Sequence, residues 1–363
     1  MKYLAFDLGK VLFDFDFNIA LTKIEDKISC RREEIIKAFF QEDFCLDFEK
    51  GLQSPYRFYE KFKEAFGANL SYDQFVDVWC DIFTPKEEMV NLISRLKTVY
   101  PVYLISNINQ LHADYLKDKF PDIFNLFDRL ILSCEVKSVK PEREIYQQLT
   151  KDNCALEDII YIDDREDLIK EAAKLNLKAV RFVDYGQVIV ALEKEGVFIP
   201  YAHEAATFSL LAEKINSCKR PLLVGLGNRL RCDDMVGSCI AEELEGELKL
   251  EVYDVKEALE NYLDKIKRYG GDLVVFLDMA KYKSLNSFEL FSFDSLDKET
   301  FCLTHNASLK LAIQYLRKEH GLDILILGIR GYNNSIGEIM SKEVMRAKSM
   351  IENFFIRNYS EKR

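Results

Sequence analysis

The sequence lacks the features that mark membrane, secreted and nucleic-acid-binding proteins. No apolar run approaches the ~20 residues of a membrane span, and the opening MKYLAFDLG is too short and too acidic for a secretory signal. The formal net charge of -11 opposes phosphate backbones and anionic membranes, and no local basic patch offsets it. We therefore expect a soluble cytoplasmic protein that binds neither nucleic acid nor membranes.

Cysteine pairs and a resident zinc motif are missing as well. The nine cysteines are scattered and never spaced as C-x-x-C, which favours reduced thiols over a disulfide framework. No H-E-x-x-H stretch is present. The chain does have an ordinary globular composition, with 48% hydrophobic and 31% charged residues over 363 positions. At roughly 100 to 200 residues per domain, that length predicts two domains.

Apolar runs alternate with helical patterns in the first half of the chain, which predicts a parallel sheet with crossover helices. The expected strands lie at residues 3–7, 102–105, 129–132, 159–162 and 179–182. An insert of amphipathic, charged stretches separates the first two strands, at about residues 17–84. A crossover of that length exceeds what one helix needs, so we expect a helical cap. The first domain is predicted over residues 1–198.

The alternation starts again in the second half. Residues 199–218 predict a linker helix, and a second domain is predicted over residues 219–363. Its expected strands lie at 222–225, 250–255, 273–277, 288–293 and 324–329, with a last long helix at about 341–358. The fold class expected for the chain is α/β: two Rossmann-like three-layer domains in tandem, the first with a helical cap inserted after its first strand.

Polar residues follow three of the predicted strands in the first domain. Asp7 follows the first strand, Ser106 the second, and Asp163 with Asp164 the fourth, while Lys140 precedes that fourth strand. A lone Asp after a strand is usually only a helix cap. Open parallel sheets bind ligands at the carboxyl ends of their strands, so the full set, in this order, predicts one catalytic site.

The stretches FDLGKVLFDFDFN, LISNINQLH and KPEREIYQ resemble the haloacid dehalogenase superfamily over roughly residues 1–195. The resemblance is strongest to its helical-cap phosphatases with a D-L-G-x-V first motif, which include sugar-phosphate phosphatases. It implies that Asp7 is a nucleophile that forms an aspartyl-phosphate. It also implies that Ser106 and Asn107 donate hydrogen bonds to the phosphoryl oxygens, and that Lys140 neutralises charge during transfer.

The same resemblance implies Mg²⁺ as the cofactor and a small phosphorylated metabolite, such as a sugar phosphate, as the substrate. The implied ligands are Asp7, the carbonyl of Gly9, Asp164 and Asp163, because magnesium prefers oxygen donors.

Two positions depart from the common pattern of the superfamily. Gly9 stands where most of these phosphatases carry a second aspartate as general acid and base, and Leu168 stands where relatives commonly offer Asn or Asp. Asp14 or Asp16 near the cap entrance, and Asp167 beside Leu168, are the expected substitutes. Two alternatives stay open: dehalogenation, and a non-catalytic docking or metabolite-sensing role for this domain.

A second cluster of polar residues is predicted in the second domain. VGLGNRLRCDDMVGSCIAEEL places Asp234 between a strand and a helix, FLDMAK ends a strand with Asp278, and FCLTHNASLKLAI places His305 before a helix. Two carboxylates and an imidazole suit a divalent transition metal such as nickel or zinc. A dinucleotide-binding loop is the alternative, but Leu230 replaces its third glycine and the adjacent acids would repel a pyrophosphate.

The pattern G-x-G-N-x-L-x-x-D-D-x-x-G resembles the NiFe-hydrogenase maturation endopeptidase family, over roughly residues 219–358. The resemblance implies Asp234, Asp278 and His305 as ligands of the substrate's own Ni²⁺. The implied partner is a NiFe-hydrogenase large-subunit precursor that loses its C-terminal extension. The whole chain is therefore predicted to be a bifunctional hydrolase, unless two neighbouring genes were joined artificially.

Overall fold

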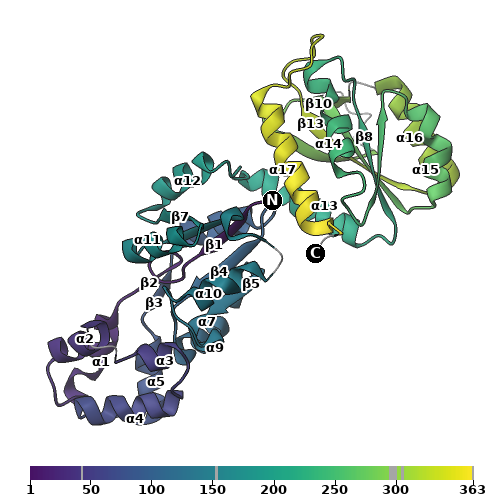
Figure 1. Ribbon diagram of the computed structural model, residues 1–363. Coiled ribbons are helices and arrows are strands. Elements are labelled where there is room, and N and C mark those ends of the chain that lie inside the picture. The colour runs from purple at the N-terminus through teal and green to yellow at the C-terminus, as the bar shows by residue number, and fades with distance from the viewer. Residues whose placement is uncertain (42–43, 152–153, 294–300, 304–305, 362–363) are drawn as a thin grey trace. The chain divides into compact units, whose positions relative to one another are not determined.

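The computed structural model describes residues 1–363 except 42–43, 152–153, 294–300, 304–305 and 362–363 (Figure 1). The chain divides into two compact units, Met1–Val197 and Phe198–Arg363. Both are α/β units built on largely parallel sheets, as the alternation of apolar runs and helical patterns predicts. No helix in the described part of the chain is long and apolar enough to span a membrane.

The first unit contains a five-stranded parallel sheet in the order β5-β4-β1-β6-β7. Its strands are β1 (Tyr3–Phe6), β4 (Val102–Ser106), β5 (Arg129–Leu132), β6 (Ile159–Asp163) and β7 (Lys178–Arg181). Every residue of β4 and β6 is buried, which explains their uninterrupted apolar sequences. Because β4 and β6 flank β1, the residues that follow these three strands share one edge of the sheet.

The helices of this sheet's crossovers and of its flanking turns are short. They are α6 (Glu87–Leu96), α7 (Gln110–Lys119), α8 (Pro121–Phe124), α9 (Ser133–Val136), α10 (Arg143–Gln147), η2 (Gln148–Thr150), η3 (Leu156–Asp158), α11 (Glu166–Lys174) and α12 (Tyr185–Lys194).

The insert after β1 consists of helices, which we call the cap. It comprises α1 (Phe17–Ile24), η1 (Glu25–Lys27), α2 (Arg32–Gln41), α3 (Leu46–Glu49), α4 (Pro55–Phe66) and α5 (Tyr72–Cys80). Two short antiparallel strands, β2 (Phe13–Phe15) and β3 (Phe83–Pro85), join it to the sheet. In α4, Ser54 caps the first turn and Gly67 ends the helix in the left-handed region.

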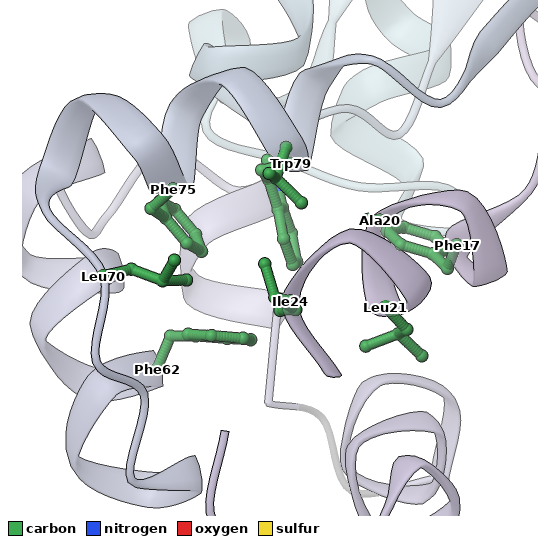
Figure 2. A pocket seen from close by; sticks show the side chains of 9 residues that line it. Phe17, Ala20, Leu21, Ile24, Phe62, Leu70, Phe75 and Trp79 are labelled. Atoms are coloured by element: carbon green, nitrogen blue, oxygen red, sulfur yellow. The ribbon is translucent and has the colours of Figure 1, made fainter. Parts of the chain in front are cut away.

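The cap has an apolar core of its own. Phe58, Tyr59, Phe62 and Phe66 form the buried face of α4, at the spacing expected of an amphipathic helix. Side chains of α1, α4 and α5 converge around a cavity of ≈ 10 Å³ (Figure 2). A cavity of that size is near the minimum for one water molecule, so it is a packing defect and not a ligand site.

The second unit contains a six-stranded sheet in the order β11-β13-β10-β8-β9, with β12 paired to the end of β10. Its strands are β8 (Pro221–Leu226), β9 (Glu251–Lys256), β10 (Leu273–Tyr282), β11 (Phe288–Ser292), β12 (Phe301–Leu303) and β13 (Asp323–Arg330). The pairs of β11 with β13 and of β12 with β10 are antiparallel, and the others are parallel. The sequence does not predict β12, because three residues are too few for a detectable period.

Helices cover both faces of this sheet. They are α13 (Ala202–Asn216), η4 (Cys232–Met235), α14 (Val236–Leu244), η5 (Leu259–Tyr262), α15 (Leu263–Tyr269), α16 (Asn306–His320) and α17 (Lys342–Tyr359). Figure 1 shows α14 with α17 on one side and α15 with α16 on the other, and the members of each pair are in contact. The arrangement is the three-layer one expected of an α/β unit.

Helix α13, over which we expected a linker, packs as part of the second unit. Phe208 is fully buried, with its ring 4.8 Å from that of Phe288 and 4.6 Å from that of Phe354. The buried carboxylate of Glu204 pairs with Arg346 of α17 at 2.9 Å. The helix therefore covers apolar side chains of β11 and α17.

Two candidate active sites

The site of the first unit is built around the ammonium group of Lys140. Its Nζ donates to Asp7 Oδ1 at 2.6 Å and to Asp163 Oδ2 at 2.7 Å. Asp7 follows β1 and Asp163 ends β6, and the two strands are paired in parallel register. All three side chains are at least nine-tenths buried. The structure therefore brings together residues that lie up to 156 positions apart in the sequence.

Asn107 holds the backbone of Lys140 in place. Its Oδ1 accepts from the Lys140 N–H at 2.7 Å, and its Nδ2 donates to the Lys140 carbonyl at 3.0 Å. Ser106, buried at the end of β4, donates only a long hydrogen bond of 3.4 Å, to the Asn107 carbonyl. The hydroxyl of Ser106 is thus available for a ligand, whereas the amide of Asn107 positions the lysine.

Three carboxylates share this single ammonium. Oxygens of Asp7, Asp163 and Asp164 all lie within 4.8 Å of one another. Burial raises the pKa of Asp7 to about 7, although Lys140 opposes the shift. Burial and then the charge of Asp163 also raise the pKa of Asp164. The cluster carries more negative charge than Lys140 offsets, so a divalent cation bound by oxygen would fit it.

The three carboxylates are not equally available to such a cation. Asp163 is fully buried, and besides Lys140 it accepts from the Tyr161 hydroxyl and, at 2.9 Å, from the Arg165 N–H. Asp164 is half-buried and has an oxygen beside the cluster. Asp7 and Asp164 are thus the better-placed ligands, and Asp163 mainly fixes Lys140.

Gly9 lies in the turn between Asp7 and β2. The turn is closed by a 2.7 Å hydrogen bond from the Lys10 N–H to the Phe13 carbonyl. That the Gly9 carbonyl binds the metal stays a prediction.

The acids expected to compensate for Gly9 and Leu168 have other partners. Asp14 lies 3.1 Å from Lys86 and 3.6 Å from Lys10, and is half-exposed. Asp16 caps α1 by accepting from the Asn18 N–H. Asp167 pairs with Arg165 at 2.6 Å on the surface, and Leu168 is buried. The contacts of these acids are with neighbouring side chains and not with the cluster.

Two contacts between the cap and the sheet unit were not predicted. Ser133 Oγ donates to the Glu49 carbonyl at 2.7 Å and accepts from the Ile108 N–H at 2.8 Å, so it links the cap to the turn after β4. His112 is buried and lies between Trp79, whose carbonyl its Nε2–H contacts at 3.0 Å, and Asn109. No local pattern could have revealed them, because each joins segments that are distant in sequence.

In the second unit, close approach of a helix places Asp234 near the strand that carries Asp278. A Cβ on Gly225 of β8 would lie 2.1 Å from the Gly237 carbonyl, and a Cβ on Gly237 would lie 2.1 Å from the Leu277 carbonyl. The two glycines of the motif therefore let α14 lie directly on β8 and β10. Asp234, in η4 at the start of this helix, is brought to the carboxyl end of the sheet, where η4 contacts β10.

Both acids are buried. Asp278 is fully buried one residue beyond the Leu277–Gly225 pair, which places it beside the end of β8. Asp234 is 3% exposed; its Oδ2 accepts from the Asn228 N–H at 3.3 Å, and its Oδ1 has no hydrogen-bond partner among the described residues. A buried carboxylate oxygen without a donor is costly, which favours a ligand at this point. His305, the third predicted ligand, lies outside the described residues.

Asp233, the neighbour of Asp234, has a different role. Its two oxygens accept from the backbone N–H groups of Tyr332, Asn333 and Ser341 at 2.7 to 2.8 Å, and from the Ser341 hydroxyl at 3.1 Å. Asp233 therefore fixes the loop between β13 and α17.

Known proteins resemble each unit separately. The family model for haloacid dehalogenase-like hydrolases matches residues 1–176. A solved haloacid dehalogenase family enzyme from Bacteroides thetaiotaomicron is 27% identical, with 52% of this chain and 98% of that chain covered, at a TM-score of 0.48.

The second unit resembles hydrogenase maturation proteases. A predicted hydrogenase maturation protease of Methanocaldococcus jannaschii is 27% identical over 133 residues, which cover 33% of this chain and 78% of that protein. A solved [NiFe] hydrogenase maturation protease from Thermococcus kodakarensis is 25% identical, covering 41% of this chain and 99% of that chain, at a TM-score of 0.37.

The chain is therefore a hydrolase made of two α/β units. The first unit matches the haloacid dehalogenase-like hydrolase family, and the second is related to the hydrogenase maturation proteases.

Proposed function

We propose that the first unit is a magnesium-dependent phosphomonoesterase that acts through an aspartyl-phosphate on Asp7. The position of Lys140 carries this proposal, because its ammonium lies within 2.7 Å of both Asp7 and Asp163. A buried cation beside a carboxylate nucleophile offsets the charge that develops on a transferring phosphoryl group. The substrate is a small phosphorylated metabolite, such as a sugar phosphate.

Each residue of the cluster has its own role in the proposed reaction. Asp7 attacks phosphorus, Lys140 neutralises charge, and the Ser106 hydroxyl donates to a phosphoryl oxygen. Asn107 acts as a positioning residue through the backbone of Lys140. Asp7 and Asp164, with Asp163 and the Gly9 carbonyl as further donors, would hold Mg²⁺. When bound, the ion polarises the phosphoryl oxygens and offsets their charge.

The test uses 4-nitrophenyl phosphate and the full chain with Mg²⁺. Asp7→Asn should lower kcat/KM by at least about 10³-fold, because an amide cannot act as the nucleophile. Asp81→Asn, an acid on the cap surface paired with Lys23 and Lys119, is the matched control and should keep its activity. Equal rates for wild type and Asp7→Asn would contradict the proposal. Tight phosphate binding without turnover would instead favour a docking or metabolite-sensing module.

For the second unit, we propose a nickel-dependent endopeptidase that removes the C-terminal extension of a NiFe-hydrogenase large-subunit precursor. The buried Oδ1 of Asp234 supports it, since no described residue donates a hydrogen bond to this oxygen. In this proposal the nickel belongs to the substrate, and Asp234, Asp278 and His305 recognise it. No disulfide joins the cysteines whose side chains the structure describes, which agrees with work in the cytoplasm.

The test is cleavage of a nickel-loaded precursor by the full chain, followed by the mass of the large subunit. Asp234→Ala and His305→Ala should abolish shortening, while Asp7→Asn should leave it intact. Cleavage by Asp234→Ala at the wild-type rate would refute the proposed ligand.

A further inference from the structure

The end of helix α3 in the cap lies against the loop that follows β4. The Glu49 carbonyl accepts from Ser133 Oγ at 2.7 Å, and the same hydroxyl accepts from the Ile108 N–H at 2.8 Å. Ile108 comes two residues after Ser106, the proposed donor to a phosphoryl oxygen. These hydrogen bonds place Glu49 beside one loop of the proposed catalytic site.

The residue after Glu49 binds the loop that carries Lys140. The Lys50 ammonium pairs with Glu142, which comes two residues after Lys140. The other oxygen of Glu142 accepts from the Val139 N–H at 3.1 Å, so this carboxylate joins the cap to both sides of the lysine. The end of α3 is thus held against a second loop of the site.

The segment with the proposed metal ligands also lies near Glu49. Arg165 directly follows Asp163 and Asp164, and its backbone N–H donates to Asp163 Oδ1 at 2.9 Å. Its guanidinium is close enough to Glu49 to lower the pKa of that carboxyl group against the effect of burial. Glu49 therefore has three neighbouring segments, and each lies within two residues of a proposed site residue. Its carboxyl group lies on the cap side of the proposed site.

The carboxyl group of Glu49 is available to a ligand. None of the described residues forms a hydrogen bond or an ion pair with it, and the side chain is only partly buried. Burial raises its pKa to about 7, although the charge of Arg165 opposes the shift. Near neutral pH the group therefore exists in both its protonated and its ionised form, as a group that gives a proton and takes one back requires.

We propose that Glu49 is a further catalytic residue, which protonates the leaving oxygen of the phosphate ester and then takes a proton from the water that releases phosphate. The inference rests on the proposed phosphatase function and adds the proton donor that Gly9 does not supply. It also agrees with a sugar phosphate as substrate, since the alkoxide of a sugar is too basic to leave readily without a proton.

The proton balance of the reaction closes on Glu49. A carboxylate oxygen of Asp7 forms a bond to phosphorus as the bond from phosphorus to the leaving oxygen breaks. The Glu49 carboxyl group gives its proton to that oxygen, so the product departs as a neutral alcohol and Glu49 becomes a carboxylate. Water then attacks the phosphorus of the aspartyl-phosphate and gives a proton to Glu49, while the bond from phosphorus to Asp7 breaks. Asp7 ends as a carboxylate and Glu49 as an acid, as they began.

The experiment measures kcat/KM of the full chain with Mg²⁺ for substituted phenyl phosphates of increasing phenol pKa and for ethyl phosphate. This constant reports the steps up to the departure of the alcohol. Glu49→Gln should lower it by at least about 10²-fold for ethyl phosphate and by less than about 10-fold for 4-nitrophenyl phosphate, whose phenol leaves without help. A merely structural role would lower kcat/KM by the same factor for every substrate.

The second readout is the time course with 4-nitrophenyl phosphate. In Glu49→Gln the first equivalent of 4-nitrophenol should appear faster than the later ones, because loss of the base slows hydrolysis of the phosphoenzyme more than its formation. A variant without this burst would overturn the assignment of Glu49 as the base.

Two further variants keep the result interpretable. Asp47→Asn removes an exposed acid from the same helix, and its dependence on the leaving group should match that of wild type. Glu49→Asp keeps the acid but shortens its reach by one methylene, so it should show the same trend as Glu49→Gln with a smaller loss. If thermal unfolding shows that Glu49→Gln does not fold, Glu49→Asp decides, and a wild-type trend in it overturns the inference.

Three other outcomes are decisive. An equal loss on all substrates in Glu49→Gln, or no loss, would overturn the inference and leave the phosphatase function intact. So would a loss confined to the poor leaving groups that appears in Glu42→Gln or Asp43→Asn and not in Glu49→Gln. Absence of turnover and of phosphoenzyme in wild type for every substrate would refute the proposed function itself.

Discussion

Each unit has two adjacent aspartates at its candidate site: Asp163 and Asp164 in the first, Asp233 and Asp234 in the second. In both pairs the first aspartate is hydrogen-bonded to other parts of the fold, and the second has an oxygen that a ligand could bind. Asp163 is fully buried and bound to Lys140, Tyr161 and Arg165. Asp233 is fully buried and bound to the loop before α17. Asp164 and Asp234 each keep an oxygen toward the site. A buried acid that is saturated with donors can fix its neighbour in place.

The pairs differ in what satisfies the committed acid. In the first unit it is a side-chain cation, Lys140, which also contacts the proposed nucleophile. In the second unit it is mostly backbone N–H groups, which add no titratable charge at the site. The first site thus contains a positive charge, as the proposed phosphoryl transfer needs, whereas the second has no such charge from its committed acid's partners, as the proposed recognition of a substrate-borne cation needs.

Of the substitutions that test this difference between the two sites, removal of Lys140 should have the largest effect on stability. Lys140→Met leaves three clustered carboxylates without their counter-charge, which we expect to destabilise the first unit by about 3–5 kcal/mol. Mg²⁺ should restore part of the loss, because it binds the same oxygens. Thermal unfolding with and without Mg²⁺ measures both effects. Lys170→Met, which removes an exposed partner of Glu166, is the control and should cost less than about 1 kcal/mol. An unchanged melting temperature for Lys140→Met would contradict the assigned role.

Acid should lower the stability of the first unit through His112, which has no counterpart in the comparison of the second unit's acids. Burial lowers the pKa of His112 from 6.5 to about 4 in the folded protein. Between these values the unfolded chain binds a proton that the folded chain does not, so stability is lost as the pH falls from 6.5 toward 4. The loss amounts to about 3 kcal/mol. His112→Gln, which keeps a donor for the Trp79 carbonyl, should remove this part of the pH dependence. If denaturant unfolding of wild type and His112→Gln runs parallel from pH 7 to pH 4, the assignment is wrong.

Substitution of Asp233 and of Asp234 in the second unit should change stability least, but it compares the roles of two adjacent acids directly. Asp233→Asn replaces one of the two acceptor oxygens by an NH₂ group, so at least one of the four donors loses its acceptor, at a cost of roughly 2–3 kcal/mol in the free energy of unfolding. Asp234→Asn should leave stability within about 1 kcal/mol of wild type, because one of its oxygens has no donor to lose, yet weaken the binding of Ni²⁺ to the site. Chemical denaturation and metal titration of both variants would check the contrast. Equal losses of stability would show that the two acids share one role.

The sequence predicts the elements better than the contacts between them. The strands around Asp7, Ser106, Asp163 and Asp278 follow from apolar runs, because burial on both faces of a parallel sheet leaves a local pattern. The meeting of Asp7 and Asp163 was expected from strand order, since carboxyl ends of neighbouring parallel strands share an edge. The place of Lys140 beside them was expected from the family resemblance.

What the sequence could not predict depends on side-chain geometry between distant segments. No periodic pattern in the sequence indicates three of these features. They are the hydrogen bonds of Asn107 to the backbone of Lys140, the hydrogen bond of Ser133 to the cap, and the burial of His112. Nor does any such pattern indicate the close approach of the Phe15 ring to Gly9, where an added Cβ would lie 2.9 Å from Cε1 of Phe15, because it requires the pairing of β2 with β3 across the whole cap. The different roles of Asp233 and Asp234 are likewise set by which oxygen meets the loop 100 residues later.

The packing of α13 decides where the chain can be divided for separate study of its halves. A fragment beginning at residue 219 would expose the rings of Phe288 and Phe354, which Phe208 now covers, and would leave Arg346 without Glu204. A fragment beginning at Phe198 keeps that helix and its ion pair. A fragment that begins at Phe198 therefore preserves the apolar interior of the peptidase-like half and avoids an exposed apolar surface that would favour aggregation.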